Sequence, residues 1–127
     1  MREKDKVGII DDDPNILEIF GKKLESEGFQ IVTASDGKTG LEMVKREKPS
    51  IILLDIMMPE KNGVEVLNEL QKNPETSRIP VIILSNVSDE AVVKKVGEFS
   101  THFYVVKALT TPQKLTSLVK EALYGEK

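Results

Sequence analysis

The sequence is poor in several features that define whole classes of protein. It has no cysteine, which excludes disulfides, thiolate metal sites and cysteine nucleophiles. Aromatic residues make up only 5% of the chain, so isoleucine, leucine and valine must fill the core. No apolar run approaches the length of a membrane span, and the charged start (residues 1–6) leads into a strand instead of a signal-peptide core. The net charge is −3 with mixed signs throughout, so nothing indicates a nucleic-acid or membrane surface, and we expect a cytoplasmic protein.

The length of the chain fits a single domain. A chain of 127 residues can bury one substantial core, so we predict one domain over residues 1–127 with its core at about 5–124. Only four residues follow Leu123, and we therefore expect no output domain in this sequence.

The chain is organised around the stretch that holds Asp55. Four apolar residues in a row, Ile51–Leu54, indicate a strand that is covered on both faces. Asp55 follows where this strand must leave the core, and Asn62-Gly63 marks a turn before the next helix. A carboxylate in this place lies where α/β sheets build their sites, although a solvated aspartate that merely ends a strand is the simpler interpretation.

The rest of the chain alternates between short apolar strands and amphipathic helices. Helix starts are indicated by Asp13-Pro14, Asp36-Gly37, Asn62-Gly63, Ser88 and Thr111-Pro112, and strands are expected at 7–10, 30–34, 51–54, 80–84 and 103–106. Five βα units of this kind predict an α/β fold, a doubly wound five-stranded parallel sheet with helices on both faces. The flavodoxin-like strand order 2-1-3-4-5 is expected, which places Asp11 and Asp12 beside Asp55.

Acidic and phosphate-binding side chains follow the buried strands in a regular order. Asp11, Asp12 and Asp55 would repel one another, and a hard divalent cation such as Mg²⁺ is the simplest remedy. Asp13 has a different interpretation, because it fits the N-cap of the first helix. Ser85 and Lys107 end the fourth and fifth strands at the same edge, so a hydroxyl and an ammonium face the carboxylates. This set predicts a phosphoryl site with Asp55 as the nucleophile.

These motifs together resemble the receiver domain of two-component response regulators. The similarity covers nearly the whole chain and is carried by Ile9-Ile10-Asp11-Asp12-Asp13-Pro14, Leu54-Asp55-Ile56-Met57-Met58-Pro59 with Asn62-Gly63, Leu84-Ser85 and Tyr104-Val105-Val106-Lys107. The resemblance implies that Asp55 accepts a phosphoryl group from the phosphohistidine of a histidine kinase or histidine phosphotransfer protein. It also implies a Mg²⁺ (or Mn²⁺) cofactor.

The resemblance assigns further roles by motif. Asp12, Asp55 and the backbone carbonyl of Met57 would hold the metal, and Asp11 would act mainly through a metal-bound water. Ser85 and Lys107 would contact the phosphoryl oxygens. Tyr104 matches an aromatic switch that turns inward when Ser85 moves toward the phosphate, so that phosphorylation biases a two-state equilibrium.

The resemblance also implies how the signal leaves the domain. A downstream protein would read the surface around the fourth helix, the fifth strand and the fifth helix, with no direct nucleic-acid or membrane contact. The chain would be a monomer or a weak phosphorylation-dependent dimer. Its biology stays open between a stand-alone regulator or phosphorelay shuttle and the excised front half of a longer regulator, and the absence of a linker favours the former.

Three features depart from the family pattern: Ala108, Asn86 and the apolar pair Met57 and Val87. Ala108 stands where the family usually has a proline joined to the lysine by a cis bond, so we expect either a trans bond or a strained cis bond, since a non-proline cis bond costs about 2.5–4 kcal/mol. Asn86 stands where a small alanine is common, and it would narrow access to the phosphoryl group or donate to it.

Three other functions are alternatives to the receiver interpretation. A degenerate receiver used only for protein docking conflicts with the complete set of site residues. A magnesium-dependent aspartyl phosphohydrolase conflicts with the lack of an acid two residues after Asp55 and of an inserted cap. A flavodoxin-like cofactor binder conflicts with the acid-lined edge, which suits a flavin phosphate poorly.

A slow loss of the phosphoryl group is the first testable prediction. Met57 and Val87 occupy positions that tune the attacking water in the resembled family, and both are apolar here. We expect the phosphorylated protein to hydrolyse slowly, measured as the decay of the phosphorylated mass after the donor is removed. A half-life of only seconds in the isolated protein would contradict this.

Overall fold

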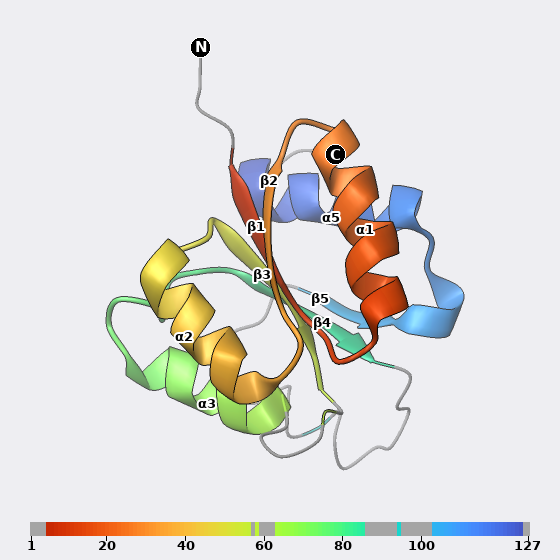
Figure 1. The fold of residues 1–127 in the computed structure, drawn as a ribbon. Coiled ribbons are helices and arrows are strands. Elements are labelled where there is room, and N and C mark those ends of the chain that lie inside the picture. The colour runs from red at the N-terminus through yellow and green to blue at the C-terminus, as the bar shows by residue number, and fades with distance from the viewer. Residues whose placement is uncertain (1–4, 57, 59–62, 86–93, 95–102, 126–127) are drawn as a thin grey trace.

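Five parallel strands form one sheet in the order β2-β1-β3-β4-β5 (Figure 1). The computed structural model describes residues 5–56, 58, 63–85, 94 and 103–125. The strands are β1 (Lys6–Ile10), β2 (Gln30–Ala34), β3 (Ile51–Asp55), β4 (Val81–Ser85) and β5 (Phe103–Val106). The predicted fold class and strand order are therefore confirmed, as is the parallel direction of the strands.

Four α-helices and one short 3₁₀ helix lie in the described part of the chain. They are α1 (Pro14–Ser26), α2 (Gly37–Glu47), α3 (Gly63–Lys72), α5 (Pro112–Tyr124) and η1 (Lys107–Leu109). Of the helix that the sequence predicts after Ser88, the described residues include only Lys94, which is helical. No described helix has the length and hydropathy that a membrane crossing requires.

The helices cover both faces of the sheet, α1 and α5 on one face and α2 and α3 on the other (Figure 1). This explains why β3 and β4 are apolar without alternation. Ile51 and Leu53 pack with the α1–α5 layer, whereas Ile52 and Leu54 pack with the α2–α3 layer. Because neither face of the central strands meets water, every residue along them must be apolar until the strand ends.

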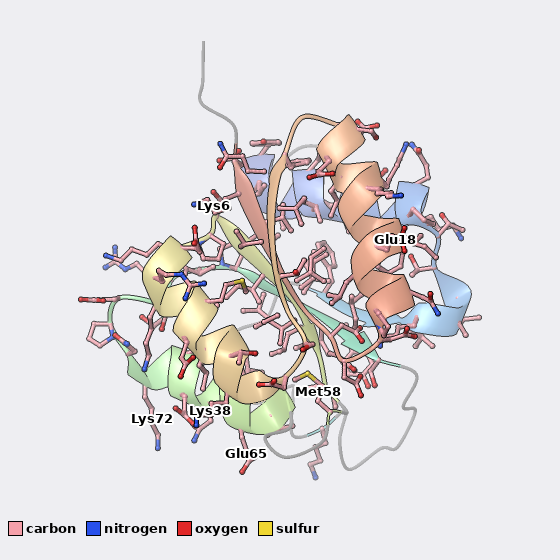
Figure 2. The ribbon with its side chains drawn as sticks, viewed as in Figure 1. Lys6, Glu18, Lys38, Met58, Glu65 and Lys72 are labelled. Carbon is pink, nitrogen blue, oxygen red and sulfur yellow. The ribbon has the colours of Figure 1, made fainter. Side chains whose placement is uncertain are left out.

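Charged side chains lie on the outer sides of the helices. Glu18, Lys38 and Lys72 point away from the sheet (Figure 2) and are exposed. Each of these helices thus has an apolar inner side and a polar outer side, as its sequence period predicts.

The helix starts are fixed by side-chain caps that the sequence indicates. Asp13 caps α1, Asp36 caps α2 and Thr111 caps α5, each by accepting a hydrogen bond from a backbone N–H in the first turn. Pro14 and Pro112 occupy the first helical positions, where a missing N–H costs nothing. Each cap therefore sets the residue at which the chain turns from the sheet edge into a helix.

Two helical glycines, Gly40 in α2 and Gly21 in α1, differ in how closely their helix approaches the sheet. A Cβ on Gly40 would lie 2.8 Å from two atoms of the buried Ile10 side chain, whereas a Cβ on Gly21 would come no closer than 3.6 Å to Ile31. Gly40→Ala is expected to destabilise the protein, because overpacking costs about 1–3 kcal/mol and exceeds the gain of about 0.5–1 kcal/mol in helix propensity. Gly21→Ala keeps only the gain and should be neutral or stabilising. Urea unfolding of both variants measures the difference, and equal midpoints would contradict the packing argument.

Candidate functional site

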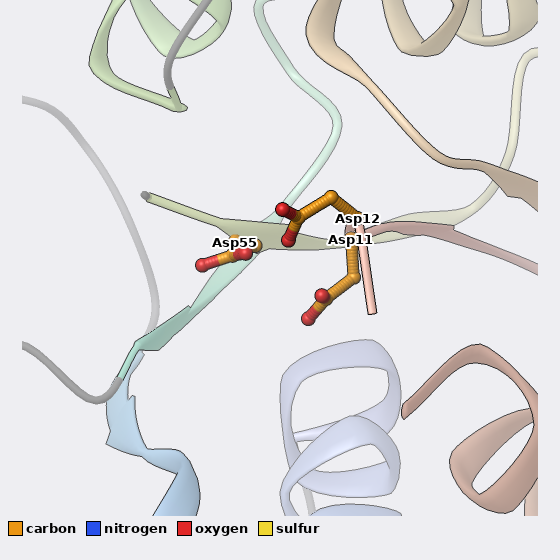
Figure 3. A group of neighbouring side chains, drawn as sticks. All are labelled: Asp11, Asp12 and Asp55. Carbon is orange, nitrogen blue, oxygen red and sulfur yellow. The ribbon is translucent and has the colours of Figure 1, made fainter. Parts of the chain in front are cut away.

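Three carboxylates meet at the carboxyl end of the sheet (Figure 3). Ile10 of β1 is paired with Leu54 of β3, so Asp11 and Asp55 leave the sheet side by side. Asp11, Asp12 and Asp55 each offer an oxygen that lies within 4.8 Å of the others. Asp11 and Asp55 are buried, at 0% and 3% exposure, while Asp12 is exposed. The predicted acidic cluster therefore has two buried members and one that faces solvent.

Lys107 supplies positive charge to the cluster from β5. It is the first residue of η1, immediately after β5, and its side chain extends past the β4 end to the two buried acids. Lys107 Nζ lies 2.6 Å from Asp11 Oδ2 and 3.4 Å from Asp55 Oδ2. Burial acts to lower the pKa of Lys107, but the Asp11 and Asp55 carboxylates outweigh it and raise the pKa above its usual value. The side chain is therefore an ammonium throughout the physiological pH range.

The charge and the donor atoms of the cluster fit a hard divalent cation. Three carboxylates face one ammonium, which leaves an excess of negative charge. The buried Asp11 Oδ2 is paired with the Lys107 ammonium 2.6 Å away, and no other hydrogen-bond donor reaches it in the described part of the chain. Carboxylate oxygens around a partly open position are the ligands that Mg²⁺ and Mn²⁺ prefer. The residues present therefore suit such an ion, with Asp12 on the solvent side.

Ser85 and Tyr104 lie on β4 and β5, the two strands that follow β3 in the sheet. Asp55 is paired with Leu84, so Ser85 ends β4 one residue beyond Asp55, and it is fully buried. Tyr104 is half-buried in β5, paired with Ile83, and packs against the α2–α3 side of the core. The structure thus brings Ser85 to the same edge as Asp55 and Lys107, and their roles in binding and switching stay predictions.

Four other residues that the sequence singles out are Met57, Asn86, Ala108 and Asp13. Met57 and Asn86 lie outside the described residues, so the metal-binding carbonyl and the polar neighbour of the phosphoryl group stay predictions. The Lys107–Ala108 bond is trans, one of the two geometries expected there. Asp13 accepts a hydrogen bond from Asn15 N, which confirms its predicted place as the cap of the first helix.

The sequence marks Gly63 only as a turn residue, but the structure gives it a place beside Asp55. A Cβ on Gly63 would overlap the carbonyl oxygen of Asp55 and lie 2.6 Å from Ile56 Cα. Gly63 N also donates to Ile56 O at 2.8 Å. Its φ is not in the left-handed region, so the requirement for glycine is one of space alone. The N-terminus of α3 therefore packs directly on the peptide that follows Asp55.

The chain matches known proteins along most of its length. The family described as "Response regulator receiver domain" matches residues 7–120. The chain belongs to this receiver-domain family. The solved signal receiver domain of a signal transduction histidine kinase from Syntrophus aciditrophicus is similar in fold, with a TM-score of 0.87 and 28% identity over 97% of this chain and 92% of that one.

Two curated relatives show the range of proteins that carry such a receiver domain. Protein PilH of Pseudomonas aeruginosa is 38% identical over 85 residues, which is 67% of this chain and 70% of PilH. The probable transcriptional regulator ycf27 of Guillardia theta is 35% identical over 123 residues, which is 97% of this chain but 47% of that protein. The chain spans about half the length of most of the curated relatives it matches.

The close packing at Gly63 yields a prediction about the receiver site. Gly63→Ala must push α3 away from the backbone of Asp55 and Ile56, since the new Cβ meets backbone atoms that cannot rotate aside. We expect a loss of about 1–3 kcal/mol in the free energy of unfolding, as for other overpacked positions. The amide resonances of Asp55 and Ile56 should also shift.

Gly21→Ala is the matched control, because it adds the same methyl group to a helix where the nearest atom is 3.6 Å away. Wild-type stability and unshifted Asp55 and Ile56 resonances in Gly63→Ala would contradict the prediction.

Proposed function

We propose that this receiver domain is a phosphorylation-dependent switch that accepts a phosphoryl group on Asp55 with the help of Mg²⁺ or Mn²⁺. The observation that supports this most is the convergence of Asp11, Asp12 and Asp55 within 4.8 Å, with the Lys107 ammonium 2.6 Å and 3.4 Å from the two buried acids. A nucleophilic carboxylate, a cation site and a fixed positive charge are the parts that phosphoryl transfer needs.

The chemistry that these residues perform is a direct displacement at phosphorus. An oxygen of Asp55 forms the new P–O bond, the P–N bond of the donor phosphohistidine breaks, and its electron pair returns to the imidazole, which takes up a proton. A bound divalent ion would supply charge neutralisation for the transferred oxygens. Asp11, Asp12 and Asp55, together with the Met57 carbonyl, would hold it.

The remaining residues orient the transferred group. Lys107 would neutralise a phosphoryl oxygen, because its ammonium is already within 3.4 Å of Asp55. Ser85 would donate its hydroxyl, since it ends the adjacent strand at the same edge, and Asn86 would add a second polar contact. When Ser85 engages the phosphoryl group, Tyr104 would turn inward and shift the equilibrium between two surface states.

The surface that carries the signal would lie at β5 and α5 and at the predicted fourth helix, of which only Lys94 is among the described residues. An open, largely apolar hollow lies between β5, η1 and α5, and it is lined in part by Tyr104, Val106, Leu109 and Leu118. Leu109 is 76% exposed, so part of the apolar lining of this hollow is open to a partner. We propose a downstream protein as the partner at this surface and a histidine kinase or histidine phosphotransfer protein as the donor.

We propose that the chain acts in the cytoplasm, together with this donor and this partner. We propose that it is a monomer or a weak phosphorylation-dependent dimer that makes no direct contact with nucleic acid or membranes. Relatives of about twice the length are named as transcriptional regulators, and a stand-alone regulator and the receiver part of a longer protein both agree with the fold.

The test is the intact mass after incubation with acetyl phosphate, with and without Mg²⁺, beside Asp55→Asn. We expect one phosphoryl group to be added to the wild type in the presence of Mg²⁺ and none to Asp55→Asn. Thr111→Ala removes the cap of α5 but none of the proposed site residues, so it is the matched control and should be phosphorylated like the wild type.

Two outcomes would overturn the proposal. Equal phosphorylation of Asp55→Asn would place the acceptor elsewhere. No phosphorylation of a folded protein that binds Mg²⁺ would favour a receiver that acts only by docking to other proteins.

A further inference from the structure

Asp13 connects the metal-binding edge of the sheet to the start of α1 through its backbone. Asp13 N donates a hydrogen bond to Asp11 Oδ1 at 2.9 Å. Asp11 is fully buried, so this N–H sets how its carboxylate is turned. With Oδ1 held in this way, Oδ2 is the oxygen that faces Lys107, at 2.6 Å. The orientation of one cluster member therefore depends on where Asp13 points its N–H.

The direction of that N–H is in turn fixed by the helix cap. Asp13 Oδ1 accepts from Asn15 N at 2.9 Å, and Asp13 O accepts from Ile16 N and Leu17 N at 3.0 and 3.2 Å. The backbone of Asp13 is extended, with φ −93° and ψ 110°, and Pro14 immediately begins the helix. The residue that turns Asp11 is thus the residue that starts α1.

The Asp13 carboxylate itself is not part of the cluster. Among the described residues, Asp11, Asp12 and Asp55 form the group whose oxygens converge, while the Asp13 carboxylate caps the helix. Asp13 can then change the affinity for the cation in two ways. It can alter the orientation of the Asp11 carboxylate, or it can act as a negative charge near the site.

We propose that Asp13 is a positioning residue whose helix cap holds Asp11 in the orientation that binds the divalent cation. This inference rests on the proposed metal binding. The coupling is reciprocal, because a residue shared by two equilibria transmits free energy in both directions. Metal binding should therefore stabilise the first turn of α1, and loss of the cap should weaken metal binding.

Four substitutions of Asp13 separate the cap from the charge. Asn and Ser are good N-caps without a charge, Glu keeps the charge but is not a preferred cap, and Ala has neither. If the cap is what matters, Asp13→Asn and Asp13→Ser bind Mg²⁺ nearly as the wild type does. Asp13→Ala and Asp13→Glu should then raise the Mg²⁺ dissociation constant by about threefold to tenfold, the range that a typical cap can supply.

Two matched controls remove a cap from the other described helices that have one. Asp36 Oδ1 accepts from Thr39 N at 2.8 Å at the start of α2, and Thr111 Oγ1 accepts from Lys114 N at 3.1 Å at the start of α5. Asp36→Ala and Thr111→Ala should lower the unfolding temperature much as Asp13→Ala does. They should leave the dissociation constant unchanged, because neither residue touches a member of the cluster.

The experiment titrates each protein with Mg²⁺ and follows backbone amide shifts, with hydrogen exchange at Ile16 and Leu17 as a second readout. In the wild type, Mg²⁺ should slow exchange at both amides, and in Asp13→Ala it should slow exchange less. Equal affinities in all five proteins of the Asp13 series would overturn the inference. Affinities that follow the charge would overturn it as well. In that case Asp13→Glu would bind Mg²⁺ like the wild type, and Asp13→Asn and Asp13→Ser would bind it like Asp13→Ala. A wild type that binds no Mg²⁺ would instead remove the proposed function on which the inference rests.

Discussion

The main physical constraint on the candidate site is the repulsion between carboxylates that lie together at one edge of the sheet. Asp11 and Asp55 are almost fully removed from solvent, and two buried carboxylates at adjacent strand ends repel each other strongly. Lys107 is the counter-charge that this arrangement has among the described residues, and it lies 2.6 Å from one acid and 3.4 Å from the other. With Asp12 beside them, one ammonium does not balance the cluster. The residues of the cluster are therefore compatible with a further cation.

The apolar core of the parallel sheet offsets the unfavourable free energy of placing these carboxylates together. The central strands are covered on both faces, at Ile51–Leu54 in β3 and along the apolar strand β4. This packing holds the residues at the ends of both strands in place. The strand order places β1 next to β3, so Asp11 and Asp55 leave neighbouring strands at the same level. Gly63 then lets α3 pack on the peptide after Asp55. A rigid core thus supports a site that is unfavourable on its own, as is usual for functional sites.

Much of this arrangement could be predicted from the sequence because it follows from periodicity. Runs without alternation, such as Ile51–Leu54, indicate strands covered on both faces, and aspartate or threonine before proline indicates a capped helix, as Asp13 and Thr111 show. The alternation of strands and helices likewise predicts the strand order 2-1-3-4-5, which the structure has. Distances between side chains could not be predicted in this way. The preference of Lys107 for Asp11 over Asp55 and the overlap that a Cβ on Gly63 would cause depend on tertiary packing, which no local pattern encodes.

The unequal distances from Lys107 to the two acids suggest how phosphorylation would act on this receiver. In the structure the ammonium is closer to Asp11, whose other oxygen is held by Asp13 N. A phosphoryl group on Asp55 would add negative charge on the Asp55 side, and the more favourable position for the ammonium would shift from Asp11 toward it. Asp11 would then lose part of its counter-charge and depend more on the metal and on the Asp13 N–H. Because this N–H belongs to the residue that caps α1, the start of the first helix is the part of the fold that such a shift of charge would reach through Asp11.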